Sequence, residues 1–280
     1  MDTNIFFIIL LATIMHAIWN AMVKHHPDKA VAVSAIVLGH LPLCIFCIIY
    51  FPLPGKESIP FLIASVLTHQ GYQWYLLNSY KVGDYTNVYP IFRGFGPLFA
   101  TLISIVFLGV VFKITTLISI LLICGGIMFL GLFGSKNQKQ TEIIKYSLLT
   151  GSFIGLYSLI DGYGARASVS AISYISFSFL FNALVFPITL KINNYQNVLP
   201  RVLKEGRLIF WVGGALSFFI YIIVVWAFTK APIPLVAALR ETSIFFSIFI
   251  GYFFLKENIN LKKIISILLI VIGVIGIKLF

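Results

Sequence analysis

The sequence consists of a series of long apolar runs, separated by short gaps that contain Pro, Gly, Asn and Lys. Crossing a bilayer core about 30 Å thick takes about 20 residues of α-helix, because each residue adds about 1.5 Å of rise. Runs of this length that recur along the whole chain predict helices that cross a membrane. The ten predicted helices span residues 5–23, 31–51, 59–80, 85–108, 114–133, 145–165, 168–190, 208–229, 233–255 and 261–279.

The composition indicates that most of the surface faces lipid. Only 10% of the 280 residues are charged, and 60% are apolar or aromatic. A soluble domain carries about 25% charged residues, because its surface faces water. The formal net charge is +11, but the basic side chains lie mostly in the gaps between apolar runs, where they act as orientation signals and contact anionic lipid headgroups. We therefore expect membrane lipids as partners and no nucleic acid.

The basic residues also predict an orientation. Lys and Arg are concentrated in the gaps after the first, third, fifth, seventh and ninth predicted helices. Because cytoplasmic loops carry the excess of Lys and Arg, these gaps are predicted to be cytoplasmic and both termini to lie outside. No gap is long enough to hold a soluble domain, so we expect a protein that is not an enzyme.

An internal repeat relates the two halves of the chain. When Arg93 is placed on Arg240, apolar and glycine positions that follow them also coincide, and His16–Asn20 matches Tyr157–Asp161 near the start of each half. Five helices is an odd number, so two such halves enter the membrane with opposite orientations. This inverted-repeat construction is found in many secondary transporters, whose substrate site lies between the halves near the bilayer midplane.

The predicted fold is an all-α membrane protein with ten transmembrane helices, arranged as two inverted five-helix repeats around a central cavity. The first repeat covers residues 1–134 and the second covers residues 145–280, joined by a short basic loop over 135–144. A monomer and a homodimer both fit the sequence, because the G-x-x-x-G pattern at 151–155 suits tight packing within one chain as well as between two chains.

Polar side chains within the apolar runs form two stripes. His16, Asn20 and Lys24 are spaced by four residues in the first predicted helix, and His69 and Gln73 have the same spacing in the third. Residues four apart lie on one face of an α-helix. An ionisable group within a membrane helix costs about 3 kcal/mol on insertion scales, so such residues are expected to face the interior. The two stripes therefore predict one shared polar cavity.

The fourth predicted helix places Arg93 between Pro90 and Pro97. Each proline removes a backbone donor, and the glycines between them weaken the helix further. Irregular backbone at membrane depth is tolerated where it lines a wet cavity. We therefore expect a loosened, irregular backbone in this helix near Arg93, at the cavity.

Charged residues of both signs are predicted in the cavity. Arg240 and Glu241 occupy the matching place in the second half, and Asp161 lies in the sixth predicted helix. The alternative is that Asp161 and one arginine form a buried ion pair that ties the halves together, since charges within membranes pair with one another. His40, in the second predicted helix, is expected to be a packed or interfacial side chain.

The residue types of the predicted site indicate a solute with charges of both signs. The planar fork of Arg suits a carboxylate or a phosphonate, and carboxylates and aromatic faces suit an ammonium group. We therefore expect a small polar or zwitterionic solute. The predicted substrate-binding residues are His16, Asn20, His69, Gln73, Trp74, Tyr89, Arg93, Tyr157, Asp161, Tyr221, Trp226, Arg240 and Glu241.

Motifs for nucleotide-driven or metal-dependent chemistry are absent from the sequence. It contains neither a G-x-x-x-x-G-K-[ST] phosphate loop nor an H-E-x-x-H metal motif. We expect no metal and no other cofactor. Protons carried by His16, His69, Asp161 or Glu241 are one candidate for energy coupling, and exchange and facilitated diffusion are the alternatives.

Over nearly its whole length the sequence resembles the EamA branch of the drug/metabolite transporter superfamily. The resemblance is carried by His16–Asn20 with Lys24, by Tyr157–Arg166, and by Phe253–Asn258, which has the family's leucine, one residue, glutamate closure before the last helix. The equivalent place in the first half reads Leu108–Val110 and lacks the acidic residue.

This resemblance implies an alternating-access carrier whose central cavity is lined by the first, third, fourth, sixth, eighth and ninth helices, with the fifth and tenth peripheral. Members of the family move amino acids, other metabolites, quaternary amines and cofactors in either direction. We therefore expect a secondary transporter of an amino acid or similar zwitterion in the bacterial cytoplasmic membrane. A flippase for a lipid-linked polar group and a receptor or assembly subunit that transports nothing are the alternatives.

Overall fold

The computed structural model describes residues 2–132, 140–255 and 260–279, and every regular element within them is a helix. The α-helices are α1 Thr3–His25, α2 Lys29–Gly39, α3 Leu41–Tyr50, α4 Ile59–Val82, α5 Tyr85–Val106, α6 Ile114–Leu132, α7 Gln140–Ala167, α8 Ala171–Ile192, α9 Val198–Glu205, α10 Gly214–Phe228, α11 Ile233–Arg240, α12 Ser243–Leu255 and α13 Leu261–Leu279. The 3-10 turn η1 Lys56–Ser58 precedes α4, and the π-helical η2 Ile209–Gly213 precedes α10. The predicted all-α class is confirmed for these residues.

Much of the chain is suited to a bilayer. In the described residues, 8 helical stretches are long and apolar enough to cross a membrane. Two more helices are long enough to cross a membrane. α4, with 24 residues, is less apolar because it carries a polar stripe, and α13, with 19 residues, is strongly apolar but carries Lys262, Lys263 and Lys278. These lengths indicate a multi-pass membrane protein, while ten spanning helices and an inverted relation of the halves stay predictions.

The helices are more numerous than the ten expected, because several predicted segments are interrupted. The segment 31–51 is divided into α2 and α3 at His40, where Pro42 occupies the first turn of α3. Proline has no N–H, and its ring displaces the preceding turn, so it ends the helix before it. The segment 208–229 begins with the π-helical η2, and 233–255 is divided into α11 and α12.

The sequence reasoning missed α9, which lies in a segment expected to be a loop. Val198 and Val202 are buried one turn apart on this helix. Arg201, on another face, donates hydrogen bonds to Glu205 at 2.9 and 2.7 Å and to Asp28 at 2.8 Å. The apolar residues are too few to be recognised as a spanning segment, although their spacing suits an amphipathic helix.

Two predicted features fall partly outside the described residues. The loop expected over 135–144 overlaps 133–139, and its remaining residues form the start of α7. In the closure motif, Glu257 belongs to 256–259, which also lie outside the described residues.

Contrary to the irregular backbone expected near Arg93, α5 is a continuous α-helix through Pro90 and Pro97. Gly94 packs so closely on α6, and Gly96 on α7, that a Cβ at either position would collide with the neighbouring helix. This close packing on both sides supports the helix where the prolines remove backbone hydrogen bonds.

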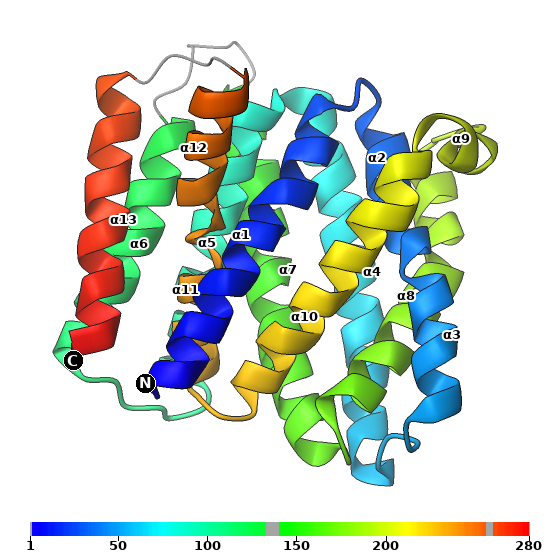
Figure 1. The fold of residues 1–280 in the computed structure, drawn as a ribbon, viewed down its shortest axis with the longest axis horizontal. Coiled ribbons are helices and arrows are strands. Elements are labelled where there is room, and N and C mark those ends of the chain that lie inside the picture. Colours follow the sequence, from blue (N-terminus) through cyan, green and yellow to red (C-terminus); the bar gives the residue numbers. More distant parts are fainter. Residues whose placement is uncertain (1, 133–139, 256–259, 280) are drawn as a thin grey trace.

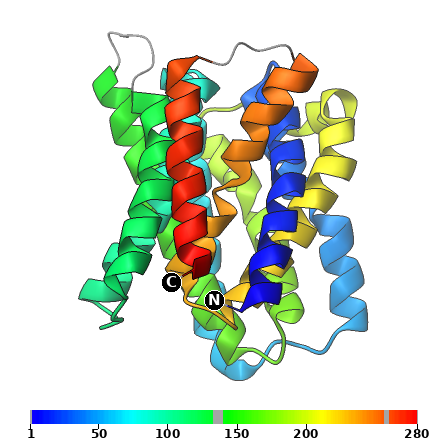
Figure 2. The same ribbon diagram turned by 60° about the vertical axis from the view of Figure 1, so that its left-hand side comes forward.

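The helices surround a polar centre. Towards one flank, α4 packs against α7 and α8, and towards the other, α5 packs against α6 and α7. The pair formed by α6 and α13 lies at the edge of the molecule (Figures 1 and 2). This peripheral place agrees with the one that the family resemblance implies for the fifth and tenth predicted helices.

Both chain termini lie at the same end of the molecule (Figure 1). Lys278 Nζ donates a hydrogen bond of 2.6 Å to Thr3 Oγ1 and so joins α13 to α1 there. We call this the terminal end. The opposite end holds Lys24, Lys262 and Lys263, and we call it the basic end; the positive-inside rule predicts that it faces the cytoplasm.

Candidate functional site

A buried cavity of about 110 Å³ lies between the two halves of the chain. We call it the central cavity. Its wall is formed by residues of α1, α2, α4, α5, α7, α8, α10 and α11, together with His40. The polar and aromatic lining residues are His16, Trp19, Asn20, His40, His69, Tyr72, Gln73, Tyr80, Tyr89, Phe92, Arg93, Tyr157, Phe179, Asn182, Ser217, Tyr221 and Arg240.

The two polar stripes of the sequence meet at this cavity, because α1 and α4 present them to the same space. Lys24 is the exception, since it lies farther along α1 at the basic end. The predicted site residues that line the central cavity are His16, Asn20, His69, Gln73, Tyr89, Arg93, Tyr157, Tyr221 and Arg240.

Two arginines and one glutamate form a buried cluster at the cavity wall, which we call the arginine cluster. Arg93 Nε lies 2.5 Å from Glu241 Oε2. Arg240 donates from Nη2 and Nε to Glu241 Oε1 at 2.9 and 3.1 Å. One carboxylate is thus paired with two guanidinium groups, so the arginine cluster has a formal net charge of +1.

His16 extends the arginine cluster. Arg93 Nη2 lies 2.6 Å from His16 Nε2. A guanidinium group only donates hydrogen bonds, so His16 Nε2 accepts this bond and carries no proton. His16 is therefore neutral in this arrangement, and the positive charge of the cluster resides on the arginines.

The position of Glu241 follows from the break between α11 and α12. Its backbone N–H donates to the carbonyls of Ala237 and Ala238 at 3.3 and 3.2 Å, which ends α11. The turn directs the Glu241 side chain, which is fully buried, behind Arg240 instead of into the central cavity. Contrary to prediction, Glu241 is therefore not part of the cavity wall.

Asp161 lies behind the wall in a second cluster. It accepts hydrogen bonds from Tyr221 OH at 2.5 Å and from Tyr174 OH at 3.2 Å, and its Oδ2 lies 3.0 Å from His69 Nε2. The ring of His69 stacks on Tyr157 at 4.2 Å. The alternative interpretation, a pair between Asp161 and an arginine, is wrong, because its partners in the described chain are a histidine and two tyrosines.

Trp74 and Trp226 do not line the cavity, so their predicted positions are wrong. Trp74 follows Gln73 directly, which turns its side chain about 100° around α4, and it is 42% exposed. Trp226 lies five residues after Tyr221, about 140° around α10 from it, and packs at the edge of the apolar core. Neighbouring positions on a helix do not share a face.

His40 is the lining residue that sequence reasoning missed most clearly. It was expected to be a packed or interfacial side chain, and it is indeed buried and stacked on Phe179 at a centroid distance of 4.5 Å. However, it also contributes to the wall of the central cavity. The signal was present, because Pro42 interrupts an apolar run just after a polar side chain.

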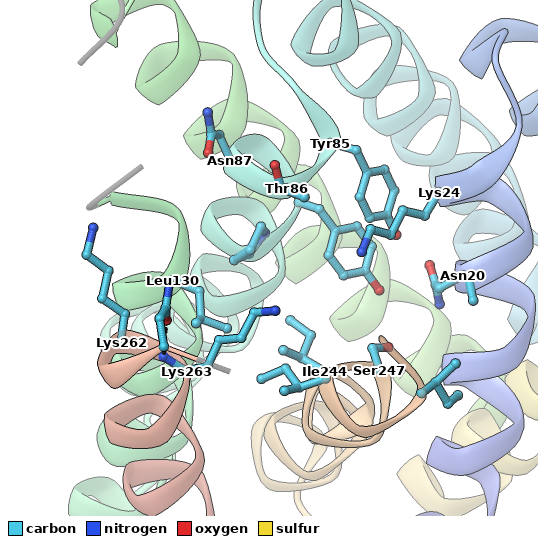
Figure 3. A pocket seen from close by; sticks show the side chains of 16 residues that line it. Asn20, Lys24, Tyr85, Thr86, Asn87, Leu130, Ile244, Ser247, Lys262 and Lys263 are labelled. Atoms are coloured by element: carbon cyan, nitrogen blue, oxygen red, sulfur yellow. Dashed lines mark hydrogen bonds between the residues drawn. The ribbon is translucent and has the colours of Figure 1, made fainter. Parts of the chain in front are cut away.

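A second cavity, of about 410 Å³, lies at the basic end and is lined by residues of α1, α5, α6, α12 and α13. We call it the basic vestibule. The ammonium groups of Lys24 and Lys263 point into it (Figure 3). Asn20 and Tyr89 line both the vestibule and the central cavity. The two cavities are therefore neighbours, separated by these side chains.

Residues 142–279 match the EamA-like transporter family. One protein of known crystal structure, whose description names neither an organism nor a function, superposes with a TM-score of 0.73 over 99% of this chain and 96% of its own, at 14% sequence identity. That likeness shows a shared fold over nearly the whole chain. No curated protein matches the sequence. Through its second half, the chain belongs to the EamA-like transporter family of the drug/metabolite transporter superfamily, and it is a multi-pass membrane transporter.

Proposed function

We propose that this protein is a secondary transporter that moves a small zwitterionic metabolite, such as an amino acid, across the bacterial cytoplasmic membrane by alternating access. The observation that carries the proposal is the arginine cluster at the wall of the central cavity. Two guanidinium groups share one carboxylate there. The remaining positive charge is offset when a solute carboxylate binds, and the planar fork of Arg suits this group.

Aromatic and amide groups in the central cavity are suited to bind the ammonium group of the solute. The rings of Tyr157 and Tyr221 line the cavity and offer negative π faces. Asn20 Nδ2 donates to the carbonyl of His16 at 2.7 Å, which leaves the side-chain oxygen of Asn20 for a solute donor. Asp161 adds negative charge from one layer behind the wall.

Alternating access is supported by the difference between the two ends. At the basic end, the vestibule reaches the side chains that bound the central cavity. At the terminal end, Arg166 of α7 donates hydrogen bonds to the carbonyls of Phe228 and Ala231, at 2.6 to 3.1 Å. These bonds close the connection between α10 and α11 against α7. Release of this contact, together with closure of the vestibule, would expose the cavity to the opposite side.

Protons are the proposed coupling ion. His69 lines the cavity, and Asp161 behind it is positioned to stabilise a protonated imidazole. The small volume of the central cavity favours a small solute over a lipid-linked group.

Transport by the purified protein in liposomes tests the proposal. We expect uptake of radiolabelled alanine or glycine into liposomes loaded with the same amino acid. Arg93→Lys keeps the charge and removes the fork, and it should raise KM at least about tenfold, because one charged hydrogen bond is worth about 1.5–3 kcal/mol. Arg201→Lys, at the exposed α9, is the matched control and should leave KM unchanged.

Normal transport by Arg93→Lys would remove the arginine cluster from solute binding. An absence of any flux with small amino acids, in a protein that remains folded, would contradict the proposed substrate class.

A further inference from the structure

Several side chains that line the central cavity have buried polar atoms without a hydrogen-bond partner among the described residues, and His40 and Gln73 are two of them. Both ring nitrogens of His40 and Oε1 of Gln73 make no hydrogen bond to any described residue. His40 is only 5% exposed and Gln73 only 2%. Buried polar atoms are nearly always paired, because burial without a partner removes their bonds to water and costs stability. Their presence at a cavity wall indicates that a ligand supplies the missing partner.

His40 reaches the cavity because of the helix break at this position and the close packing of Gly39 before it. It lies at the break between α2 and α3, and the preceding Gly39 packs directly on the backbone of η2 and α10. A side chain on residue 39 would push this junction away, so glycine there lets the next residue reach the interior. The imidazole is then held flat against Phe179, with an interplanar angle of 18°.

His40 and Gln73 lie on the same side of the cavity. Phe179 touches His40 at a centroid distance of 4.5 Å and His69 at 5.7 Å. Gln73 is one helical turn from His69 on the same face of α4. Arg93 of the arginine cluster lies over the ring of Tyr89 at 5.7 Å.

We propose that His40 and Gln73 form a second binding pole, which accepts hydrogen bonds from an N–H or O–H group of the solute. The inference rests on the proposed function, in which the arginine cluster holds the solute carboxylate. A neutral imidazole has one acceptor nitrogen and one N–H, and the amide oxygen of glutamine accepts two bonds. The substrate class is therefore a small carboxylic acid with an amino or hydroxyl group beside the carboxylate.

The cavity volume limits the rest of the solute. About 110 Å³ is available, which is less than the roughly 150 Å³ cavity that takes up one benzene molecule. An α-amino or α-hydroxy acid with a methyl side chain fits this space, and an aromatic amino acid does not.

Three probes with one carbon skeleton test the second pole. Propionate, lactate and alanine differ only in carrying hydrogen, hydroxyl or ammonium at the carbon beside the carboxylate. Binding to the purified full-length protein is measured by calorimetry. Lactate and alanine should bind the wild type about tenfold more tightly than propionate, as expected for one or two hydrogen bonds.

His40→Leu and Gln73→Leu remove the proposed acceptors. Each should weaken lactate and alanine binding about tenfold and leave propionate binding unchanged. His40→Gln keeps an acceptor and a donor and should recover much of the discrimination. Ser266→Ala is the matched control, because the buried hydroxyl of Ser266 also has no hydrogen-bond partner in the described part of the chain but lies on α13, outside the cavity.

Thermal unfolding without ligand separates a binding role from a structural one. Leucine removes the unpaired polar atoms, so the Tm of His40→Leu and Gln73→Leu should stay the same or rise. A lower Tm would show that these side chains stabilise the fold and would overturn the inference. Equal weakening of all three probes would overturn it as well.

Binding by the leucine variants tests the second pole, and binding by Arg93→Ala tests the carboxylate site of the proposed function. If wild-type protein binds alanine and both leucine variants keep their preference for lactate over propionate, the second pole is refuted and the transporter proposal stands. If Arg93→Ala binds all three probes like the wild type, the proposed carboxylate site is refuted instead. Tight binding of tryptophan would refute the size limit.

Discussion

Replacement of Glu241 by glutamine should strongly destabilise the protein, because this carboxylate is shared by two arginines. Arg93 Nε lies 2.5 Å from one carboxylate oxygen, and Arg240 Nη2 lies 2.9 Å from the other. All three residues are at most 5% exposed. Glutamine keeps the size and one acceptor oxygen but removes the charge. Two guanidinium groups would then share a buried wall with no carboxylate beside them.

The expected loss follows from the cost of breaking a buried ion pair. Removal of one partner typically costs about 3–5 kcal/mol, because the other charge is left uncompensated. For a chain of this size, 1 kcal/mol corresponds to about 2 °C in Tm, so Glu241→Gln should lower Tm by about 6–10 °C. The assay is thermal unfolding in detergent, followed by intrinsic fluorescence and by loss of the monodisperse species.

Two further variants make this prediction specific. Glu205→Gln changes the same residue type in an exposed i, i+4 pair with Arg201 and should leave Tm unchanged within error. Adding Arg240→Gln to Glu241→Gln removes one of the two uncompensated cations, so the double variant should recover part of the lost Tm. A Tm within about 2 °C of the wild type for Glu241→Gln would refute the view that one carboxylate compensates both arginines.

Three other changes test separate parts of the molecule. Asp161→Asn should abolish stimulation of uptake by an inward proton gradient and preserve exchange, as measured by liposome flux with and without the gradient; unchanged stimulation would exclude this carboxylate from coupling. Arg166→Gln should loosen the terminal end, seen as faster labelling of Tyr157→Cys by an impermeant maleimide, whereas an unchanged rate would argue against a closing role. Hydrogen bonds from Arg201 lower the pKa of Glu205, so their contribution to α9 is present above the unfolded pKa of about 4.3 and is lost as pH falls through the lower folded value. Amide exchange in α9 should therefore gain extra protection, beyond the intrinsic effect of pH, between pH 3 and pH 5; its absence would contradict the pairing.

Local periodicity was sufficient to predict the parts of the site that lie on one helix. His16 and Asn20, or His69 and Gln73, share a face because of the helical repeat, and no tertiary information is needed to see it. The same rule explains the error at Trp74, which was grouped with Gln73 by proximity in sequence although adjacent residues diverge around the axis.

Contacts between residues on different helices could not be predicted from the sequence. The number of residues between Arg93 and Glu241 does not tell how far apart they lie in space. Their contact, and that of Asp161 with His69, are therefore known only from the packing of the helices. The continuity of α5 through Pro97 has the same origin, because the neighbouring helices compensate for a local weakness. The pairing of these side chains and the continuity of α5 are determined by tertiary contacts, which override local helix propensity.

The positions of the two buried carboxylates explain why the central cavity should prefer a solute with an acidic group over a cation that lacks one. Asp161 and Glu241 both lie one layer behind the wall, where they fix His69, Tyr221 and Arg240 by hydrogen bonds. Their oxygens are thereby occupied, and the groups that face the solute are the donors that they hold in place. A cation without an acidic group would meet guanidinium charge at one side and only aromatic or neutral polar groups elsewhere. Because like charges at short range in a buried site repel strongly, quaternary amines should bind this cavity worse than zwitterions do, even though aromatic faces are available to them.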